Sequence, residues 1–314
     1  MKQNIHISVV VPMFNEEGNA KLLHHEIVTV LEKMQTSFEI IFVNDGSSDG
    51  TAQELQTLSP LTVIHFRKNF GQTAALDAGF KHANGKYIIA MDGDGQNDPA
   101  DIPKLVAYLE EHNLDVVSGW RKHRQDNKNK KIASLIAARV RKFLINDGIH
   151  DSGCTLKIYR KECFDHVDLY GEMHRFIPAV LKIKGFSVGE IVVNHRPRIA
   201  GVTKYTWKRG IKGVLDMGSV WFWKKYANRP LHLFGSLGVV LFLLGSVGFG
   251  IALYQKIFSG VSLSDTALTI LSLITLLISI QFIVFGLLAD ILSKTYFSAT
   301  KDKIYDIKNI SENA

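Results

Sequence analysis

Two aspartates stand one residue apart directly after an apolar run. The run Tyr87–Met91 predicts a buried strand, and Asp92-Gly93-Asp94-Gly95-Gln96 follows it at once. Carboxylate oxygens are the ligands that Mg²⁺ and Mn²⁺ prefer, and such an ion commonly shares its coordination shell with a substrate phosphate. An isolated Asp-x-Asp is also compatible with a solvated acidic turn. The position after a strand, with Gln96 two residues later, favours a metal site that handles a nucleotide diphosphate.

Alternating strands and helices must position these aspartates. Apolar runs predict strands at residues 7–11, 39–43, 61–66, 87–91 and 115–118. Helical spacing of apolar residues predicts a helix after Asn15, which we expect to be its N-cap, and further helices over 73–82 and from about 99. This alternation is typical of an α/β fold with a mostly parallel sheet that is covered on both faces.

Polar side chains follow three of the predicted strands. Asn15-Glu16, Asp45 and the Asp92/Asp94 pair each stand where a strand ends. In a parallel sheet, ligands bind beyond the carboxyl ends of the strands. We therefore predict that these residues share one site.

The charge and the cysteine content of the chain indicate which kinds of molecule it binds and in which cellular compartment it is found. The chain has 314 residues, enough for one large domain or two ordinary ones, and its formal charge of +7 is compatible with an anionic partner. The two cysteines, Cys154 and Cys163, form no metal-thiolate motif and are predicted to be reduced thiols in a cytosolic compartment. No secretory signal is expected, because the first apolar run is short and ends at Pro12.

The C-terminal third contains two long uncharged stretches. Leu231–Gln255 and Thr266–Ala289 carry no charged side chain, and each is long enough to cross a bilayer core of about 30 Å. The alternative is a pair of buried core helices. Lysines and arginines flank the outer ends, so the positive-inside rule predicts a two-span hairpin with both ends in the cytoplasm. Gly245, Gly248 and Gly250 permit close helix approach, and we expect the hairpin to be an anchor and an oligomerisation surface.

Two basic segments lie outside these stretches. Nine lysines or arginines and one aspartate occur between Arg121 and Lys142, and apolar residues recur there at helical spacing. The segment 205–229 has a similar pattern. Basic amphipathic helices of this kind suit a membrane surface. The alternative is that both are solvated faces of a globular domain.

Three segments resemble the signature segments of family-two glycosyltransferases. They are Pro12-Met13-Phe14-Asn15-Glu16-Glu17, Val43-Asn44-Asp45-Gly46-Ser47-Ser48-Asp49-Gly50-Thr51 and Asp92-Gly93-Asp94-Gly95-Gln96. Five more segments, with the paired apolar stretches, are similar to the polyprenyl-phosphate branch of that family: Asn69–Gln72, Val117–Arg121, His150–Lys157, Gly171–Pro178 and Gly201–Tyr205. The resemblance covers essentially the whole chain.

The resemblance implies a glycosyltransferase A-type fold and an inverting transfer of one sugar to a lipid phosphate. The expected partners are a nucleotide-diphosphate sugar, for which we predict UDP-glucose, and a polyprenyl phosphate, for which we predict undecaprenyl phosphate. Nucleic acid is not expected. Transfer would occur at the cytoplasmic face of the plasma membrane.

The resemblance also implies roles for individual residues. The nucleotide would be held by Pro12, Asn15, Glu16, Asp45, Asp92 and Gly93. Asp92 and Asp94 would bind the Mg²⁺ or Mn²⁺ that holds the diphosphate, and Gln96 would complete its shell. The acceptor phosphate would be faced by Arg121, Lys130, Ser134 and Arg198. We expect Asp94, Arg121 and Asp151 to be the catalytic residues.

The chemistry accounts for the residue types. Breaking a sugar–diphosphate bond builds negative charge on the leaving diphosphate, which a divalent ion stabilises. A phosphate monoester has a second pKa of about 6, so a lipid phosphate needs cations to position it rather than a strong base. Asp151 is the best remaining carboxylate for an orienting or proton-accepting role, and a structural turn at 150–153 is the alternative. His174 and Arg175 would either contact the ligand or only cap and pack.

We expect a catalytic domain over residues 1–200, with an interface helix inserted at about 128–146. A juxtamembrane helix over 201–230, two spans within 231–292 (about 231–255 and 266–290) and a cytoplasmic tail over 293–314 would follow.

Three other functions are weighed against this one. A processive polysaccharide synthase usually carries a Gln-x-x-Arg-Trp motif, which this chain lacks. A non-catalytic, membrane-anchored nucleotide-sugar-binding protein would not need the intact acidic pair. A dehydrogenase would need Gly-x-Gly-x-x-Gly after the first strand, where none occurs.

Overall fold

The computed structural model describes residues 5–122, 148–165, 167, 169, 171, 173–197, 218–223, 225–226 and 229–299. The chain divides into an α/β unit that extends to Val220 and a helical unit that begins at Trp221.

A seven-stranded sheet forms the centre of the α/β unit. Its strands are β1 (Ile7–Met13), β2 (Phe38–Asn44), β3 (Thr62–His65), β4 (Tyr87–Ala90), β5 (Val116–Trp120), β6 (Lys157–Arg160) and β7 (Val188–Val192), in the spatial order β3-β2-β1-β4-β6-β5-β7. Only β6 is antiparallel to its neighbours, so the sheet is mostly parallel, as predicted. β6 and β7 were not among the predicted strands.

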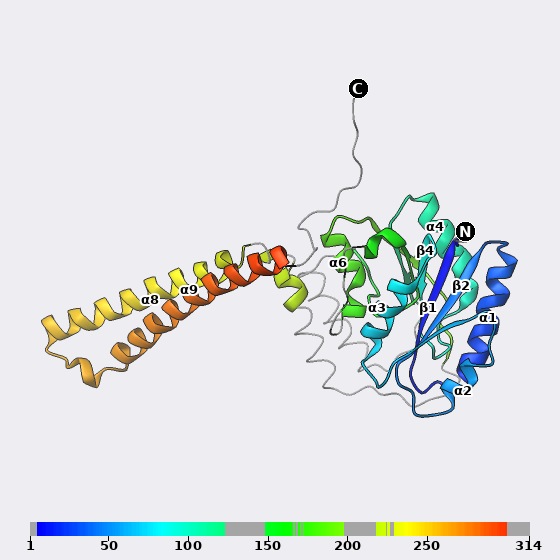
Figure 1. Ribbon diagram of the computed structural model, residues 1–314. Helices are drawn as coiled ribbons and strands as arrows, with labels where there is room; N and C mark the ends of the chain where they lie inside the picture. Colours follow the sequence, from blue (N-terminus) through cyan, green and yellow to red (C-terminus); the bar gives the residue numbers. More distant parts are fainter. Residues whose placement is uncertain are drawn as a thin grey trace, which may run out of the picture. The chain divides into compact units, whose positions relative to one another are not determined.

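Helices cover both faces of this sheet. The larger core cluster joins α1 (Asn19–Lys33) and α4 (Ile102–Glu111) to one face, and a second cluster joins α3 (Gln72–His82) and α6 (Ile177–Ile183) to the other. Figure 1 shows α1 and α3 on opposite sides of β1 and β2. A short helix, α2 (Thr51–Leu55), follows β2. Alternate residues of the buried strands enter the two clusters, which is why these strands are mostly apolar.

The expected N-cap of α1 is wrong. The helix begins at Asn19, and its N-cap is Gly18. Asn15 instead adopts a left-handed conformation with φ of 55°, and its side-chain oxygen accepts a hydrogen bond from Ser48 N at 2.9 Å. The Asn15 side chain thus joins the loops that follow β1 and β2, and it does not cap α1.

The direction of β6 decides what lies at the carboxyl edge of the sheet. The parallel strands β1, β2, β4 and β5 end at this edge, and the antiparallel β6 begins there. The residues that precede Lys157 therefore reach the same edge as the residues that follow Ala90 and Trp120.

The helical unit contains two long apolar helices, α8 (Pro230–Ser259) and α9 (Ala267–Ala299), which lie side by side (Figure 1). Each has a window long and apolar enough to cross a membrane, of which only 17% is buried in the structure. A core helix of a soluble domain would be mostly buried, so this exposure favours membrane anchoring.

Small residues form the contact between the two helices. Gly238, Gly245 and Ala252, seven residues apart, are buried on α8. A Cβ on Gly245 would lie 2.9 Å from Leu276 of α9, whereas a Cβ on Gly250 would meet nothing within 4 Å. Gly248 also packs against α9. Two of the three glycines expected on an oligomerisation surface are thus used within the hairpin.

Candidate functional site

The loops that follow β1 and β2 are joined by hydrogen bonds. Asn15 N donates to Ser47 Oγ at 3.0 Å, and Glu16 N donates to Thr51 Oγ1 at 2.9 Å. Glu16 also accepts a 2.8 Å hydrogen bond from Asn19 at the start of α1. These bonds fix two of the predicted nucleotide-binding residues at the carboxyl edge of the sheet.

Asp45 organises the neighbouring loop. It is 3% exposed, and its two carboxylate oxygens accept hydrogen bonds from Phe70 N at 2.7 Å and Gly71 N at 2.9 Å. Gly46 has a φ of 68°, and a Cβ there would collide with the backbone of Lys68, so this turn requires glycine. Asp45 therefore determines where the start of α3 lies.

The start of α3 in turn contacts the acidic turn. Gln72 Nε2 donates to Asp92 Oδ1 at 2.7 Å, and Asp92 N donates to Asn97 Oδ1 at 2.9 Å. Asp94 is 9% exposed, and its Oδ1 accepts a 3.2 Å hydrogen bond from Gln96 N. The turn is thus bent back on itself, with Asp92 and Asp94 close enough to affect each other's ionisation.

Gly93 lets the acidic turn approach the end of β1. A Cβ at this position would lie 3.0 Å from Pro12 O and closer still to Met13 Sδ. Any side chain would push the turn away from β1. The close approach brings Pro12 and Gly93, both predicted nucleotide-binding residues, into contact range.

The acidic turn fits a divalent cation. Burial, and then the negative charge of Asp94, raise the pKa of Asp92, so the two carboxylates lie close enough together to face one cation. In the described part of the chain, no group of three or more His, Cys, Asp or Glu side chains could hold a metal. Two carboxylates, with other ligands from Gln96, water and a diphosphate, are typical of Mg²⁺ sites.

Arg121 and Asp151 form a two-bond ion pair beside this turn. Arg121 Nε lies 2.7 Å from Asp151 Oδ2, and Nη2 lies 3.0 Å from Oδ1. The two side chains are only 10% and 19% exposed. Burial raises the pKa of Asp151, but the hydrogen bonds and charge of Arg121 lower it further, so that the net pKa is below its ordinary value. A carboxylate so engaged is a poor proton acceptor and a good positioning group.

The backbone around Asp151 is also held. Glu190 of β7 accepts hydrogen bonds from His150 N and Asp151 N, each with a distance of 2.9 Å. Thr155 Oγ1 donates to Asn97 Oδ1 at 2.9 Å, the same oxygen that accepts the hydrogen bond from Asp92 N. Asn97 therefore links the acidic turn to the segment that carries Asp151.

Lys157 is a site residue to which the sequence analysis assigned no role. It is 2% exposed, and its Nζ donates to the carbonyl oxygens of Ser152 and Cys154. Burial lowers the pKa of Lys157, and the charges of Asp151, Arg121 and Asp92 all act on it. Gln72 and Glu190 were also given no role. Lys157 and Gln72 stand inside the segments that resemble the polyprenyl-phosphate branch, and this was the available signal.

His174 packs against the start of α3. Its Nδ1 lies 2.8 Å from Thr73 Oγ1, and the side chain is 7% exposed. Arg175 Nε donates to His174 Nε2 at 3.3 Å. These contacts favour the packing alternative for His174. The predicted acceptor residues Lys130, Ser134 and Arg198 lie outside the described residues.

Comparisons with known proteins identify relatives over almost the whole chain. A family profile described as Glycosyl transferase family 2 matches residues 8–168. Dodecaprenyl-phosphate galacturonate synthase of Rhizobium johnstonii is 37% identical over 99% of this chain and 94% of its own length. Undecaprenyl-phosphate 4-deoxy-4-formamido-L-arabinose transferase of Proteus mirabilis is 30% identical over 97% of this chain and 93% of its own length.

The solved structures agree on the fold. Glucosyl-3-phosphoglycerate synthase of Mycobacterium tuberculosis, solved with Mn²⁺, UDP and glucosyl-3-phosphoglycerate, has a TM-score of 0.55 and 16% identity, over 71% of this chain and 81% of that chain. Mannosyl-3-phosphoglycerate synthase of Rubrobacter xylanophilus has a TM-score of 0.56 and 16% identity, over 69% and 74%. With the fold, the family profile and both full-length relatives in agreement, this chain belongs to glycosyl transferase family 2, in its polyprenyl-phosphate glycosyltransferase branch.

Proposed function

We propose that this chain transfers one sugar from a nucleotide-diphosphate sugar to a polyprenyl phosphate at the cytoplasmic face of the membrane, with inversion. One observation carries the proposal: an acidic pair and a buried arginine–carboxylate pair meet at one edge of the sheet, linked through Asn97 Oδ1. This reaction needs carboxylates that bind a metal–diphosphate and a cationic side chain that binds a lipid phosphate. The names of both full-length relatives support the acceptor class.

Asp92, Asp94 and Gln96 would hold Mg²⁺ or Mn²⁺, which supplies charge stabilisation to the departing diphosphate. Arg121, fixed by Asp151, would orient the lipid phosphate. An oxygen of that phosphate attacks the anomeric carbon as the bond to the nucleotide diphosphate breaks, and the nucleotide diphosphate leaves. The acceptor is already largely dianionic at neutral pH, so no residue needs to remove a proton.

The donor that we predicted from the sequence is UDP-glucose, and the acceptor is undecaprenyl phosphate. The 37% identity to a galacturonate synthase makes UDP-galacturonate a second candidate donor. The test is a donor panel: purified full-length protein is given undecaprenyl phosphate, Mn²⁺ and one of UDP-glucose, UDP-galacturonate, UDP-N-acetylglucosamine or GDP-mannose. Mass spectrometry of the lipid fraction reads the product. We expect one sugar per lipid from one preferred donor.

Variants test the proposed metal residues. Asp94→Ala should abolish transfer, whereas Asp165→Ala, which removes an exposed acid, should leave it unchanged. Undiminished metal-dependent transfer by Asp94→Ala would refute the metal assignment. A polymeric product would indicate a processive synthase, and no product from any donor would count against an enzyme of this class.

A further inference from the structure

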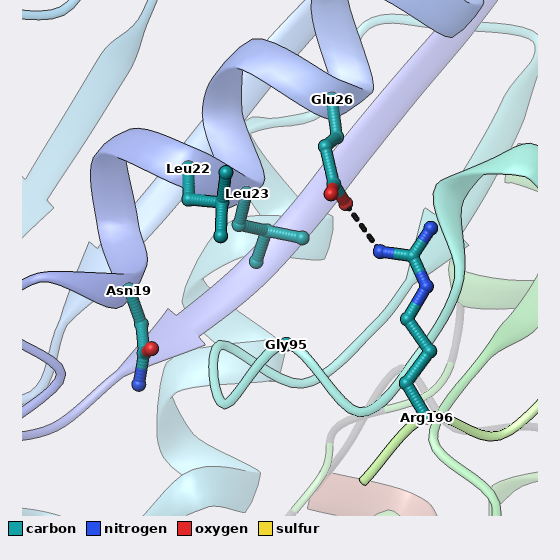
Figure 2. A pocket seen from close by; sticks show the side chains of 6 residues that line it. All are labelled: Asn19, Leu22, Leu23, Glu26, Gly95 and Arg196. Atoms are coloured by element: carbon teal, nitrogen blue, oxygen red, sulfur yellow. Dashed lines mark hydrogen bonds and ion pairs between the residues drawn. The ribbon is translucent and has the colours of Figure 1, made fainter. Parts of the chain in front are cut away.

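Arg196 connects the acidic turn to α1. Its Nη1 lies 2.7 Å from Glu26 Oε2 on α1, and its Nη2 lies 2.6 Å from Asp98 Oδ1, two residues beyond Gln96. Figure 2 shows Arg196 reaching Glu26 at a pocket that Gly95 of the acidic turn also lines. A single guanidinium thus spans two carboxylates that belong to different elements.

The backbone around Arg196 makes a second set of contacts with the same turn. Arg196 N donates to Gln96 O at 2.9 Å, and His195 forms an isolated β-bridge with Asn97. Asn194 Nδ2 donates to Asp98 Oδ2 at 2.9 Å. Three consecutive residues after β7, Asn194–Arg196, therefore hold Gln96 at the end of the acidic turn and the two residues that follow it.

The acidic turn needs contacts from outside because its own backbone has wide conformational freedom. Gly95 has a φ of 70° and no side chain to restrict it. Within Asp92–Asn97, Gln96 N donates to Asp94 Oδ1 and Asp92 N donates to Asn97 Oδ1, and neither of these bonds ties the turn to another element. Metal ligands must be held closely, and loss of the groups that orient them typically costs 10–100-fold in metal affinity.

From these contacts we infer that Arg196 is a positioning residue for the metal site: by joining Glu26 to Asp98 it fixes Asp94 and Gln96 for a divalent cation. The inference rests on the proposed metal site. It adds a residue that contacts neither metal nor substrate and acts through the turn.

The test measures metal affinity directly rather than activity. Purified full-length protein with UDP is titrated with Mn²⁺, and electron paramagnetic resonance reads the unbound ion. Arg196→Met should weaken Mn²⁺ binding by about 10–100-fold. Arg196→Lys should restore part of the loss, because lysine has the charge but lacks the planar fork that reaches both carboxylates. Glu26→Gln removes only one ion pair and should give a smaller loss than Arg196→Met.

Arg160→Met is the matched control. Arg160 is the last residue of β6, at the end of the strand away from Lys157. Its Nε donates to Leu114 O at 2.9 Å and forms an ion pair with Asp115. This variant should bind Mn²⁺ like the wild type. Wild-type affinity in Arg196→Met, or an equal loss in Arg160→Met, would overturn the inference and leave the proposed function standing. A wild-type protein that binds no Mn²⁺ would overturn the metal site itself and the inference with it.

Discussion

Replacing Asp151 with asparagine should separate a positioning role from a proton-accepting one. The substitution keeps one oxygen acceptor for Arg121 but removes the negative charge opposite a guanidinium that is only 10% exposed. A hydrogen bond to a charged group contributes about 1.5–3 kcal/mol, so we expect a loss of about 2 kcal/mol in the free energy of unfolding. For a unit of this size, that corresponds to a fall of about 4–8 °C in melting temperature.

The pH dependence of this loss follows from the lowered pKa of Asp151. A carboxyl group whose pKa is lower in the folded state stabilises the fold fully above its unfolded pKa of about 3.9 and loses that contribution as pH falls through the folded pKa. The stability difference between wild type and Asp151→Asn should therefore be constant from pH 8 to pH 5. It should shrink below about pH 4, which thermal melts across this range would measure.

Activity should fall by a moderate factor. A loosened Arg121 should lower kcat/KM for the lipid phosphate about 10-fold, or about 1.4 kcal/mol, with little change in the KM for the donor. The pH–rate profile should keep its shape between pH 5 and 8, because the pair does not titrate there. A variant that melts with the wild type yet loses more than 1,000-fold in kcat, with the acidic limb of its profile abolished, would refute this reasoning and identify Asp151 as a base.

Further variants probe the other contacts. Asp45→Asn should release the loop before α3 and weaken UDP binding by about 10-fold in calorimetry, because an amide cannot accept both backbone hydrogen bonds; unchanged binding would contradict its organising role. Lys157→Met should lower kcat/KM for the lipid phosphate. Arg160→Met removes a cation from the other end of β6 and should leave this kcat/KM unchanged. Equal losses in the two variants would indicate that both act through general destabilisation. Gly245→Leu should separate the two apolar helices and lower the melting temperature in detergent, whereas Gly250→Leu, which has open space, should be tolerated; the reverse order would contradict the packing.

The sequence predicted the first five strands well because buried strands appear in it as short runs of apolar residues. Strands covered on both faces are nearly continuous apolar runs, and β1, β2 and β4 are of this kind. β6 begins and ends with a basic residue, and β7 contains a glycine and a glutamate. Lys157 is accommodated by two carbonyl oxygens and Glu190 by two backbone amides, and those partners exist only once the chain has folded.

The prediction of a shared site likewise gave the positions of residues along the sheet edge, and it did not give the contacts that their side chains make. Strand-end positions were enough to bring Asn15, Asp45 and the Asp92/Asp94 pair to one edge, because parallel strands end together. They could not show that Asp45 uses both oxygens on the backbone of another loop. Nor could they show Arg196, since its role depends on carboxylates 98 and 170 positions away in the chain.

The reversed direction of β6 has a consequence for how such enzymes diversify. Arg121 and Asp151 stand 30 positions apart, yet their side chains form an ion pair, so these two residues lie close together at the carboxyl edge of the sheet. The ion pair therefore joins the residue that follows β5 to the segment that precedes β6. Because both residues are held next to strand ends, we expect related chains to differ in length and sequence between these two positions while the registers of β5 and β6 stay the same.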